Sequence, residues 1–183
     1  MRITTREKDT NWFYLFHNAH TYIVEFKKWG GKMEETIRKA EKKDVKRLES
    51  FLLEANLNAE GVAEAIDYYS LLETKSGALK ACIGIEPVNG VGMLRSFVVS
   101  EGTSQVQILL LFDRVIRIVE GNNLKALYLA TNKESAVSFF NKIGFNTVKE
   151  IPVALYNHPH FEQVSNVDNT IIMEMKVGIV DNS

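Results

Sequence analysis

Residues 97–116, FVVSEGTSQVQILLLFDRVI, pass from a run of strand-forming residues through a short polar turn into an apolar helical pattern. A strand, a tight turn and a buried helix in this order commonly bind a phosphate, because backbone N–H groups and the helix N-terminus both point at the anion. Such turns are usually rich in glycine, whereas this one contains only Gly102. The stretch leaves two alternatives open: a cofactor site that has lost its glycines, or a turn that never was such a site.

The composition around this stretch fits one ordinary domain of 183 residues, with 45% hydrophobic and 25% charged residues. A net charge of −1 offers no basic field, so we expect no nucleic-acid partner and no anionic membrane partner. No run approaches the ~18 apolar residues of a membrane span, and no secretory signal is legible, which predicts a cytoplasmic protein. The single cysteine, Cys82, lies in the apolar run ALKACIGI and is predicted to be a buried thiol.

Hydrophobic periodicity and turn residues predict the remaining elements. Asp44 is a candidate N-cap for a helix beginning at Val45, and Gly77 is suited to a hairpin turn. The predicted strands are residues 36–40, 67–74, 78–88, 93–100, 125–131, 145–150 and 171–177, and the predicted helices begin at 45 and span 59–66, 104–120 and 134–143, with a long loop before the last strand. This order predicts an α/β sandwich around one mixed sheet, without repeats or a second domain.

Residues 136–145, AVSFFNKIGF, resemble the A-x-x-x-[YF]-x-K-x-G-F signature of the GNAT superfamily of acyl-CoA N-acyltransferases. The resemblance spans roughly residues 36–177. It implies the GNAT fold, a mixed central sheet with helices on both faces, in a domain of residues 33–178 followed by a tail of residues 179–183. Within the superfamily, residues 84–100 and 124–131 are similar to the acetyltransferases of arsenic-resistance operons.

This resemblance implies acetyl-CoA as the co-substrate. In the family, the strand that carries SFVVS splays from the strand ALYLAT, and the pantetheine arm binds the free backbone groups of the first strand in the resulting cleft. The turn that follows binds the pyrophosphate. The residues implied to bind the cofactor are Phe97, Val98, Val99, Thr103, Ser104, Gln105, Val106, Gln107, Ile108, Asn132, Ser135 and Phe140. Structural alternatives are helix capping for Asn132 and Ser135, and a core aromatic for Phe140.

The chain departs from the family pattern in two places. Gly102 lies too early, the turn is one residue short, and residues 105–109 (QVQIL) occupy the family's R/Q-x-x-G-x-G/A positions. Since each β-carbon narrows the approach of a phosphate to the backbone, we predict weak acetyl-CoA binding that glycine at Gln105 and Gln107 would tighten. Phe140 stands where many members carry a tyrosine that protonates the leaving thiolate, and phenylalanine has no proton to give.

The acceptor side is predicted from two charged residues in apolar strands. Glu86 ends a strand and is a candidate general base for the attacking amine, with a solvated turn carboxylate as the alternative. Arg95, with Ser96, is a candidate to bind the substrate, since an arginine fork suits a carboxylate or another oxyanion. The structural alternative is an ion pair with Glu86 or Glu73. The spacing of His158 and His160 is poor for two metal ligands, so we predict no metal site and expect their loop to cover the acceptor side.

The resulting hypothesis is the transfer of an acetyl group from acetyl-CoA to the amine of a small molecule, by direct attack in a ternary complex. A backbone N–H of the SFVV strand would bind the oxyanion of the tetrahedral intermediate. The alternative is a GNAT-fold module that has lost catalysis and binds a small ligand or a protein partner.

The N-terminal residues 1–32 form a separate question. WGGKM, residues 29–33, reverse-translates into a purine-rich string before a start codon, which predicts a translated leader before Met33. The alternative is a native extension, in which residues 20–26 alternate as an extra strand. If native, its aromatic residues Trp12, Phe13, Tyr14 and Phe16 predict a homodimer contact.

Overall fold

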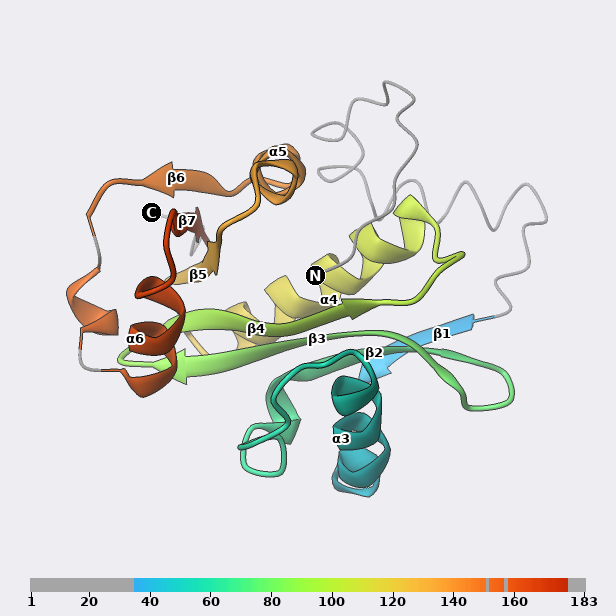
Figure 1. Ribbon diagram of the computed structural model, residues 1–183. Coiled ribbons are helices and arrows are strands. Elements are labelled where there is room, and N and C mark those ends of the chain that lie inside the picture. Colours follow the sequence, from blue (N-terminus) through green and yellow to red (C-terminus); the bar gives the residue numbers. More distant parts are fainter. Residues whose placement is uncertain (1–34, 151, 157, 178–183) are drawn as a thin grey trace, which may run out of the picture. The chain divides into compact units, whose positions relative to one another are not determined.

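The computed structural model describes residues 35–150, 152–156 and 158–177 (Figure 1). The predicted leader, the aromatic dimer contact and the tail of residues 179–183 lie outside these residues. The strands are β1 (Glu35–Lys39), β2 (Tyr69–Thr74), β3 (Leu79–Val88), β4 (Val91–Val99), β5 (Ala126–Thr131), β6 (Asn146–Val148) and β7 (Ile171–Lys176), and the helices are α3 (Val45–Glu54), α4 (Gln105–Gly121), α5 (Glu134–Lys142) and α6 (Pro159–Ser165), with 3₁₀ turns η1 (Lys42–Asp44), η2 (Ile66–Tyr68) and η3 (Val153–Leu155).

The strands form one mixed sheet in the order β1-β2-β3-β4-β5-β7-β6. The pair β4–β5 is parallel, while β1–β2, β2–β3, β5–β7 and β6–β7 are antiparallel. The strands MLRSFVVS and KALYLAT, which the family resemblance implied to lie beside each other, are parallel neighbours paired at Gly92↔Leu127 and Met93↔Tyr128. The chain divides into two compact units, residues 35–85 with 96–115 and residues 86–95 with 116–177, so β3, β4 and α4 each contribute to both.

In the first unit, α3 covers one face of the β1–β2–β3 strands (Figure 1). Leu48 and Leu52 of α3 are fully buried and share a hydrophobic cluster with Leu71 of β2 and Cys82 of β3, which are register partners. Because strand side chains alternate between faces, the fully buried Leu72, Ala81 and Ile83 belong to the opposite face. Both faces of these strands are therefore buried, as the α/β pattern predicted.

A network of four charges, the Asp44 cluster (Arg38, Asp44, Arg47 and Glu73), joins α3 to this sheet. Arg38 makes a two-pronged contact with Asp44 at 2.7 and 2.8 Å, and its Nε donates to Glu73 at 2.7 Å. Arg47 Nε donates to Asp44 at 2.9 Å. Asp44 occupies the predicted N-cap position, but its side chain caps η1 and binds arginines rather than the N–H groups of α3.

The predicted helix at residues 59–66 is wrong. This segment forms successive turns that lead into η2. Gly61 has φ +76, a left-handed conformation that an α-helix cannot include. The apolar residues Val62 and Ile66 still reach the core, where both are buried. The helical spacing of these apolar residues therefore indicated their burial correctly, although the segment is not a helix.

In the second unit, β5 pairs with β4 at Gly92↔Leu127 and Met93↔Tyr128 and with β7 along its whole length. The cluster Val88, Met93, Ala126, Tyr128, Leu155 and Phe161 forms a core under η3 and α6. Asn89 and Gly90 have φ +46 and +83, as a two-residue hairpin turn between β3 and β4 requires. The segment predicted as one long loop contains η3 and α6, the latter beginning with proline at its first turn.

Candidate functional site

Three charged or titratable side chains meet in the second unit and form the Glu86 cluster (Glu86, Arg95 and His158). Arg95 Nη1 donates to Glu86 Oε2 at 3.3 Å, and His158 Nε2 lies 3.5 Å from Glu86 Oε1. The exposed fractions of the three side chains are 26%, 10% and 18%. A carboxylate, a guanidinium and an imidazole thus lie in contact with one another while each side chain keeps some access to solvent.

Local structure explains how Glu86 and His158, which lie 72 positions apart in the sequence, come into contact. The Asn89–Gly90 turn folds β4 back along β3, which places Glu86 and Arg95 on the two arms of one hairpin. The Asn89 side-chain amide donates to the Ala154 carbonyl at 2.9 Å and so ties the segment before α6 to the tip of this hairpin. The His158 N–H in turn donates to Leu155 O at 3.2 Å, which fixes the histidine at the start of α6.

Chemically, the cluster combines an acceptor, a fixed cation and a titratable ring. The buried Nδ1 atom of His158 has no hydrogen-bond partner among the described residues, and a buried polar atom in this state carries a desolvation cost that a ligand could remove. The arrangement is suited to holding a small polar ligand and moving a proton on it.

Glu86 and Arg95, the two residues predicted for the acceptor side, therefore lie in contact, and His158 joins them. Of the two ion pairs considered for Arg95, the pair with Glu86 is confirmed, whereas Glu73 is bound by Arg38 and Arg47 instead. Sequence reasoning considered His158 as a metal ligand, rejected that role, and assigned it no part in the acceptor chemistry. No spacing rule connects it to Glu86, because the contact depends on the tertiary path of residues 152–158. This segment contacts Glu86 through His158 and Asn89 through Ala154, and the expectation that it covers the acceptor side stays a prediction.

In the first unit, β4 changes its backbone conformation at Ser96, which has φ +54. A non-glycine residue in the left-handed region within a strand is uncommon and marks a break in regular strand geometry, as at a β-bulge. The Ser96 hydroxyl accepts from Tyr69 Oη at 3.1 Å, and its carbonyl accepts from Cys82 Sγ at 3.3 Å. Burial raises the pKa of the Cys82 thiol to about 12, so the predicted buried thiol is confirmed and is no nucleophile.

The predicted cofactor residues of β4 follow this break. Phe97 is buried, in edge-to-face contact with Phe112 of α4 at a centroid distance of 5.2 Å, while Val98 and Val99 are half-buried. Gly102 has φ +78 with open space around it, so this position needs glycine for its conformation. Thr103 Oγ1 donates to Ser100 O at 2.8 Å and closes the turn.

The N-terminus of α4 is capped by its own side chains. Ser104 N donates to Gln107 Oε1 at 2.7 Å and Gln107 N donates to Ser104 Oγ at 3.3 Å, a reciprocal capping box. Gln105, Val106 and Ile108, placed in the phosphate turn by the resemblance, lie in the first turn of this helix, and Ile108 is buried. Two N–H donors at this helix end are thus engaged by the protein itself, and pyrophosphate binding by this turn stays a prediction.

The remaining predicted cofactor residues lie around α5 in the second unit. Asn132 and Ser135 are exposed, and neither caps α5, whose N-cap residue is Lys133. Phe140 is buried in edge-to-face contacts with Phe139 and Phe145 at 5.2 and 5.5 Å. Phe140 therefore has the packing of the core aromatic proposed as its structural role, and its contact with a cofactor stays a prediction.

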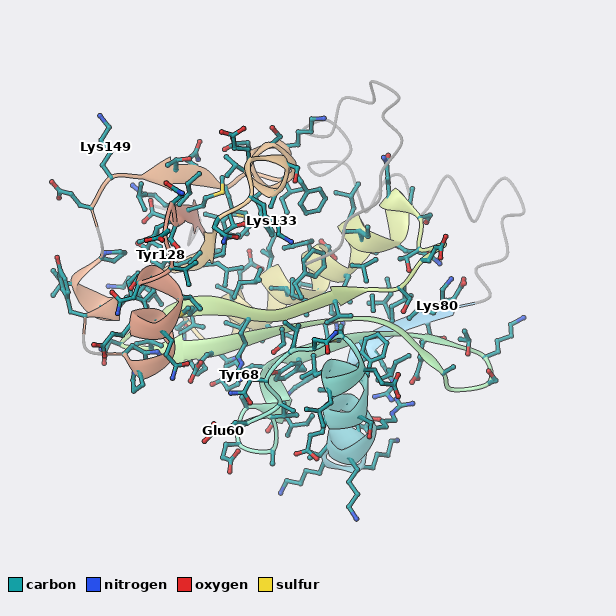
Figure 2. All side chains as sticks on the ribbon, viewed as in Figure 1. Glu60, Tyr68, Lys80, Tyr128, Lys133 and Lys149 are labelled. Carbon is teal, nitrogen blue, oxygen red and sulfur yellow. The ribbon has the colours of Figure 1, made fainter. Side chains whose placement is uncertain are left out.

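A buried tyrosine of this unit was not singled out by sequence reasoning. Tyr128 of β5, labelled in Figure 2, donates its hydroxyl to Glu174 of β7, its register partner. Burial, with the nearby Glu174 carboxylate, raises the pKa of Tyr128 to about 12. The hydroxyl therefore stays protonated at neutral pH and fixes the β5–β7 pair.

Residues 35–150, 152–156 and 158–177 contain no group of three His, Cys, Asp or Glu side chains arranged to hold a metal ion. Within the same ranges, no helix combines the length and the apolar composition that crossing a membrane requires.

A protein of similar sequence shows the family to which the chain belongs. No protein-family profile matches the chain. The Bacillus subtilis (strain 168) protein YwlB, described as uncharacterised, is 31% identical over 143 residues, which cover 78% of this chain and 97% of YwlB.

Solved structures share the fold at lower identity. N-acetylglutamate synthase from Neisseria gonorrhoeae, in complex with coenzyme A and N-acetyl-glutamate, has a TM-score of 0.63 and 19% identity over 80% of this chain, which spans only 36% of that enzyme. Rv2747 from Mycobacterium tuberculosis, in complex with CoA, has a TM-score of 0.62 and 16% identity, with 77% and 98% of the two chains covered. A GNAT-family acetyltransferase from Staphylococcus aureus Mu50 has a TM-score of 0.60 and 18% identity, with 79% and 99% covered. The chain therefore belongs to the family of Bacillus subtilis YwlB and has the GNAT acyl-CoA N-acyltransferase fold.

Proposed function

We propose that this protein is an N-acetyltransferase that moves an acetyl group from acetyl-CoA to the amine of a small molecule. The observation that carries the proposal is the Glu86 cluster. It supplies, in one unit, a carboxylate that can take a proton, an arginine that can hold an anionic substituent, and a histidine with a buried nitrogen available to a ligand. An amine must lose a proton to attack a thioester, and Glu86 would accept that proton directly, through water or through His158.

The acyl-CoA part of the proposal is supported by the fold and by β4. Structures of this fold hold CoA in the proteins from Neisseria gonorrhoeae and Mycobacterium tuberculosis. We assign the pantetheine contacts to the backbone of Phe97, Val98 and Val99, in the manner of an added strand. A backbone N–H of this segment would bind the oxyanion, whose charge develops as the amine attacks the thioester carbon.

The substrate would be an amine that also carries an acidic group. Arg95 is the ligand for that group, because its guanidinium forms charge-assisted hydrogen bonds that place the amine near Glu86. The likeness of residues 84–100 and 124–131 to the arsenic-resistance-operon acetyltransferases belongs to the same proposal.

The test measures acetyl-CoA binding by calorimetry and the release of free CoA thiol with a panel of amines, with and without a carboxylate. We expect turnover with the acidic amines and its loss in Glu86→Gln, which keeps the shape of the side chain but cannot take the proton. Binding of acetyl-CoA without turnover of any amine would contradict an acetyltransferase.

A second candidate function is favoured by the capping box of α4. Because Ser104 and Gln107 satisfy each other's N–H groups, the helix end needs no anion, and Phe140 supplies no proton for a leaving thiolate. Both features suit a GNAT-fold module that binds a small ligand without catalysis. Failure of the full-length protein to bind acetyl-CoA at millimolar concentration, with ligand-induced stabilisation by small carboxylates, would favour this function.

A further inference from the structure

The conformation of Ser96 depends on side chains from two other strands of the first unit. Tyr69 of β2 is fully buried, and its hydroxyl reaches past β3 to donate to Ser96 Oγ of β4 at 3.1 Å. A tyrosine can span two strand spacings in this way only if the strand between them offers no side chain in its path.

Gly84 provides that path. It is the register partner of Tyr69, and a β-carbon at Gly84 would lie 2.4 Å from the tyrosine ring, far inside van der Waals contact. The φ of Gly84 is not left-handed, so glycine here serves the close approach of the ring and not a turn. Tyr69, Gly84 and Ser96 therefore form one arrangement.

The contacts of Ser96 offset the free-energy cost of its left-handed backbone conformation. A non-glycine residue at φ +54 is held there against a preference for the strand region. The Tyr69 hydrogen bond holds the Ser96 side chain, and the contact from Cys82 Sγ holds its carbonyl at 3.3 Å. The left-handed residue redirects the N–H and C=O groups of the residues that follow it, Phe97 to Val99.

We propose that Tyr69, laid across Gly84, is a positioning residue that holds Ser96 in the left-handed conformation and thereby aims the β4 backbone groups at acyl-CoA. The proposal rests on the proposed function, because it assigns these backbone groups to the cofactor. Tyr69 itself touches no reacting atom.

The test compares four variants of the full chain by acetyl-CoA calorimetry: Tyr69→Phe, Ser96→Ala, Ser96→Gly and the matched control Tyr68→Phe. Tyr69→Phe and Ser96→Ala lose the hydrogen bond but keep a β-carbon in the left-handed region, so we expect acetyl-CoA affinity to fall about fivefold. Ser96→Gly also loses the bond, yet glycine adopts this conformation without support, so its affinity stays within about twofold of wild type. Tyr68→Phe leaves affinity unchanged.

A hydrogen bond that merely stabilises the fold would make Ser96→Gly as weak as Ser96→Ala, and that result overturns the proposal, as does unchanged affinity in Tyr69→Phe. Amide hydrogen exchange of residues 97–99, measured without acetyl-CoA, tests the positioning role of Tyr69 separately from the proposed function. If wild type does not bind acetyl-CoA, the proposed function fails. Faster exchange in Tyr69→Phe and Ser96→Ala, but not in Ser96→Gly, then still supports the positioning role, and equal exchange in all variants rejects it.

Discussion

The Asp44 cluster and the Glu86 cluster differ in how fully their members satisfy one another's hydrogen-bonding groups. In the Asp44 cluster, one nearly buried carboxylate accepts from two arginines and from the Glu41 N–H, at 2.7 to 2.9 Å. In the Glu86 cluster the two ion contacts are 3.3 and 3.5 Å, and a buried histidine nitrogen has no partner among the described residues. The first arrangement is closed and anchors α3 to the sheet, whereas the second retains capacity for a ligand.

Electrostatics agrees with a structural role for the Asp44 cluster. Hydrogen bonds from Arg38 hold the pKa of Asp44 well below its usual range, and the same arginine, followed by Arg47, lowers the pKa of Glu73. Hydrogen bonds to Asp44 and Glu73 raise the pKa of Arg38. Such mutual stabilisation of charged forms is typical of a structural network. Changes to the Asp44 cluster should therefore act on stability, and changes to the Glu86 cluster on binding.

The largest effect is expected at Asp44. Its side chain is only 2% exposed, so Asp44→Ala would take a buried acceptor from the partly exposed Arg38 and Arg47 and lower the free energy of unfolding by about 3 kcal/mol. Urea denaturation measures the change. The control is Lys43→Ala, which removes a pair with Glu41 between side chains that are 71% and 59% exposed and should change stability by less than about 0.5 kcal/mol. Equal losses of stability in Asp44→Ala and Lys43→Ala would show that the buried Asp44 cluster stabilises the protein no more than an exposed ion pair.

The next largest effect is expected at Arg95. Arg95→Ala removes the ligand proposed for the acidic group of the acceptor, and the acceptor KM should rise about thirtyfold, as for one charged hydrogen bond. The KM for acetyl-CoA should change little. The matched control is Arg114→Ala, at an exposed position of α4. An unchanged acceptor KM in an active preparation would remove Arg95 from the site and leave it as the structural partner of Glu86.

The pH dependence of stability tests whether ion pairs hold the Asp44 cluster together. Because the folded-state pKa of Asp44 is depressed, its contribution to stability is complete above the unfolded pKa near 4 and is lost as pH falls toward the folded value. The stability difference between wild type and Asp44→Asn should therefore narrow by about 1 kcal/mol between pH 6 and pH 3. Asp168→Asn, in an exposed turn, is the control and should run parallel to wild type. A constant gap for Asp44→Asn would show that the ion pairs are not what holds the cluster.

The smallest effect is expected at the α4 cap. Gln107→Gly frees the Ser104 N–H and removes a buried side chain from the turn, so acetyl-CoA should bind about fivefold more tightly, the equivalent of one hydrogen bond. Gln105→Gly alone is the comparison, since Gln105 has no part in the capping box. Calorimetric titration distinguishes them. Equal dissociation constants in wild type and both variants would show that the phosphates do not use these donors.

Local patterns predicted most of the elements because each depends on neighbours in sequence. Alternation identified β2 to β5, the Gly77 turn has the expected left-handed glycine at φ +85, and Gly144 ends α5 with φ +105. The same reasoning failed at residues 59–66, where apolar spacing matched a helix but Gly61 interrupts it. It also failed to find α6 in the segment predicted as a loop.

The sequence by itself determined the order of the strands along the chain, the burial of Cys82, and two members of the Glu86 cluster, because charges in apolar strands are costly unless they serve a contact. Only the tertiary structure decided that His158 joins Glu86, that Arg38 binds Glu73, and that Tyr69 crosses Gly84 to Ser96. These contacts join residues 27 to 72 positions apart or strands that are not neighbours, so no local periodicity encodes them. They arise when the sheet closes and each buried polar group must find a partner among whatever the fold brings within reach.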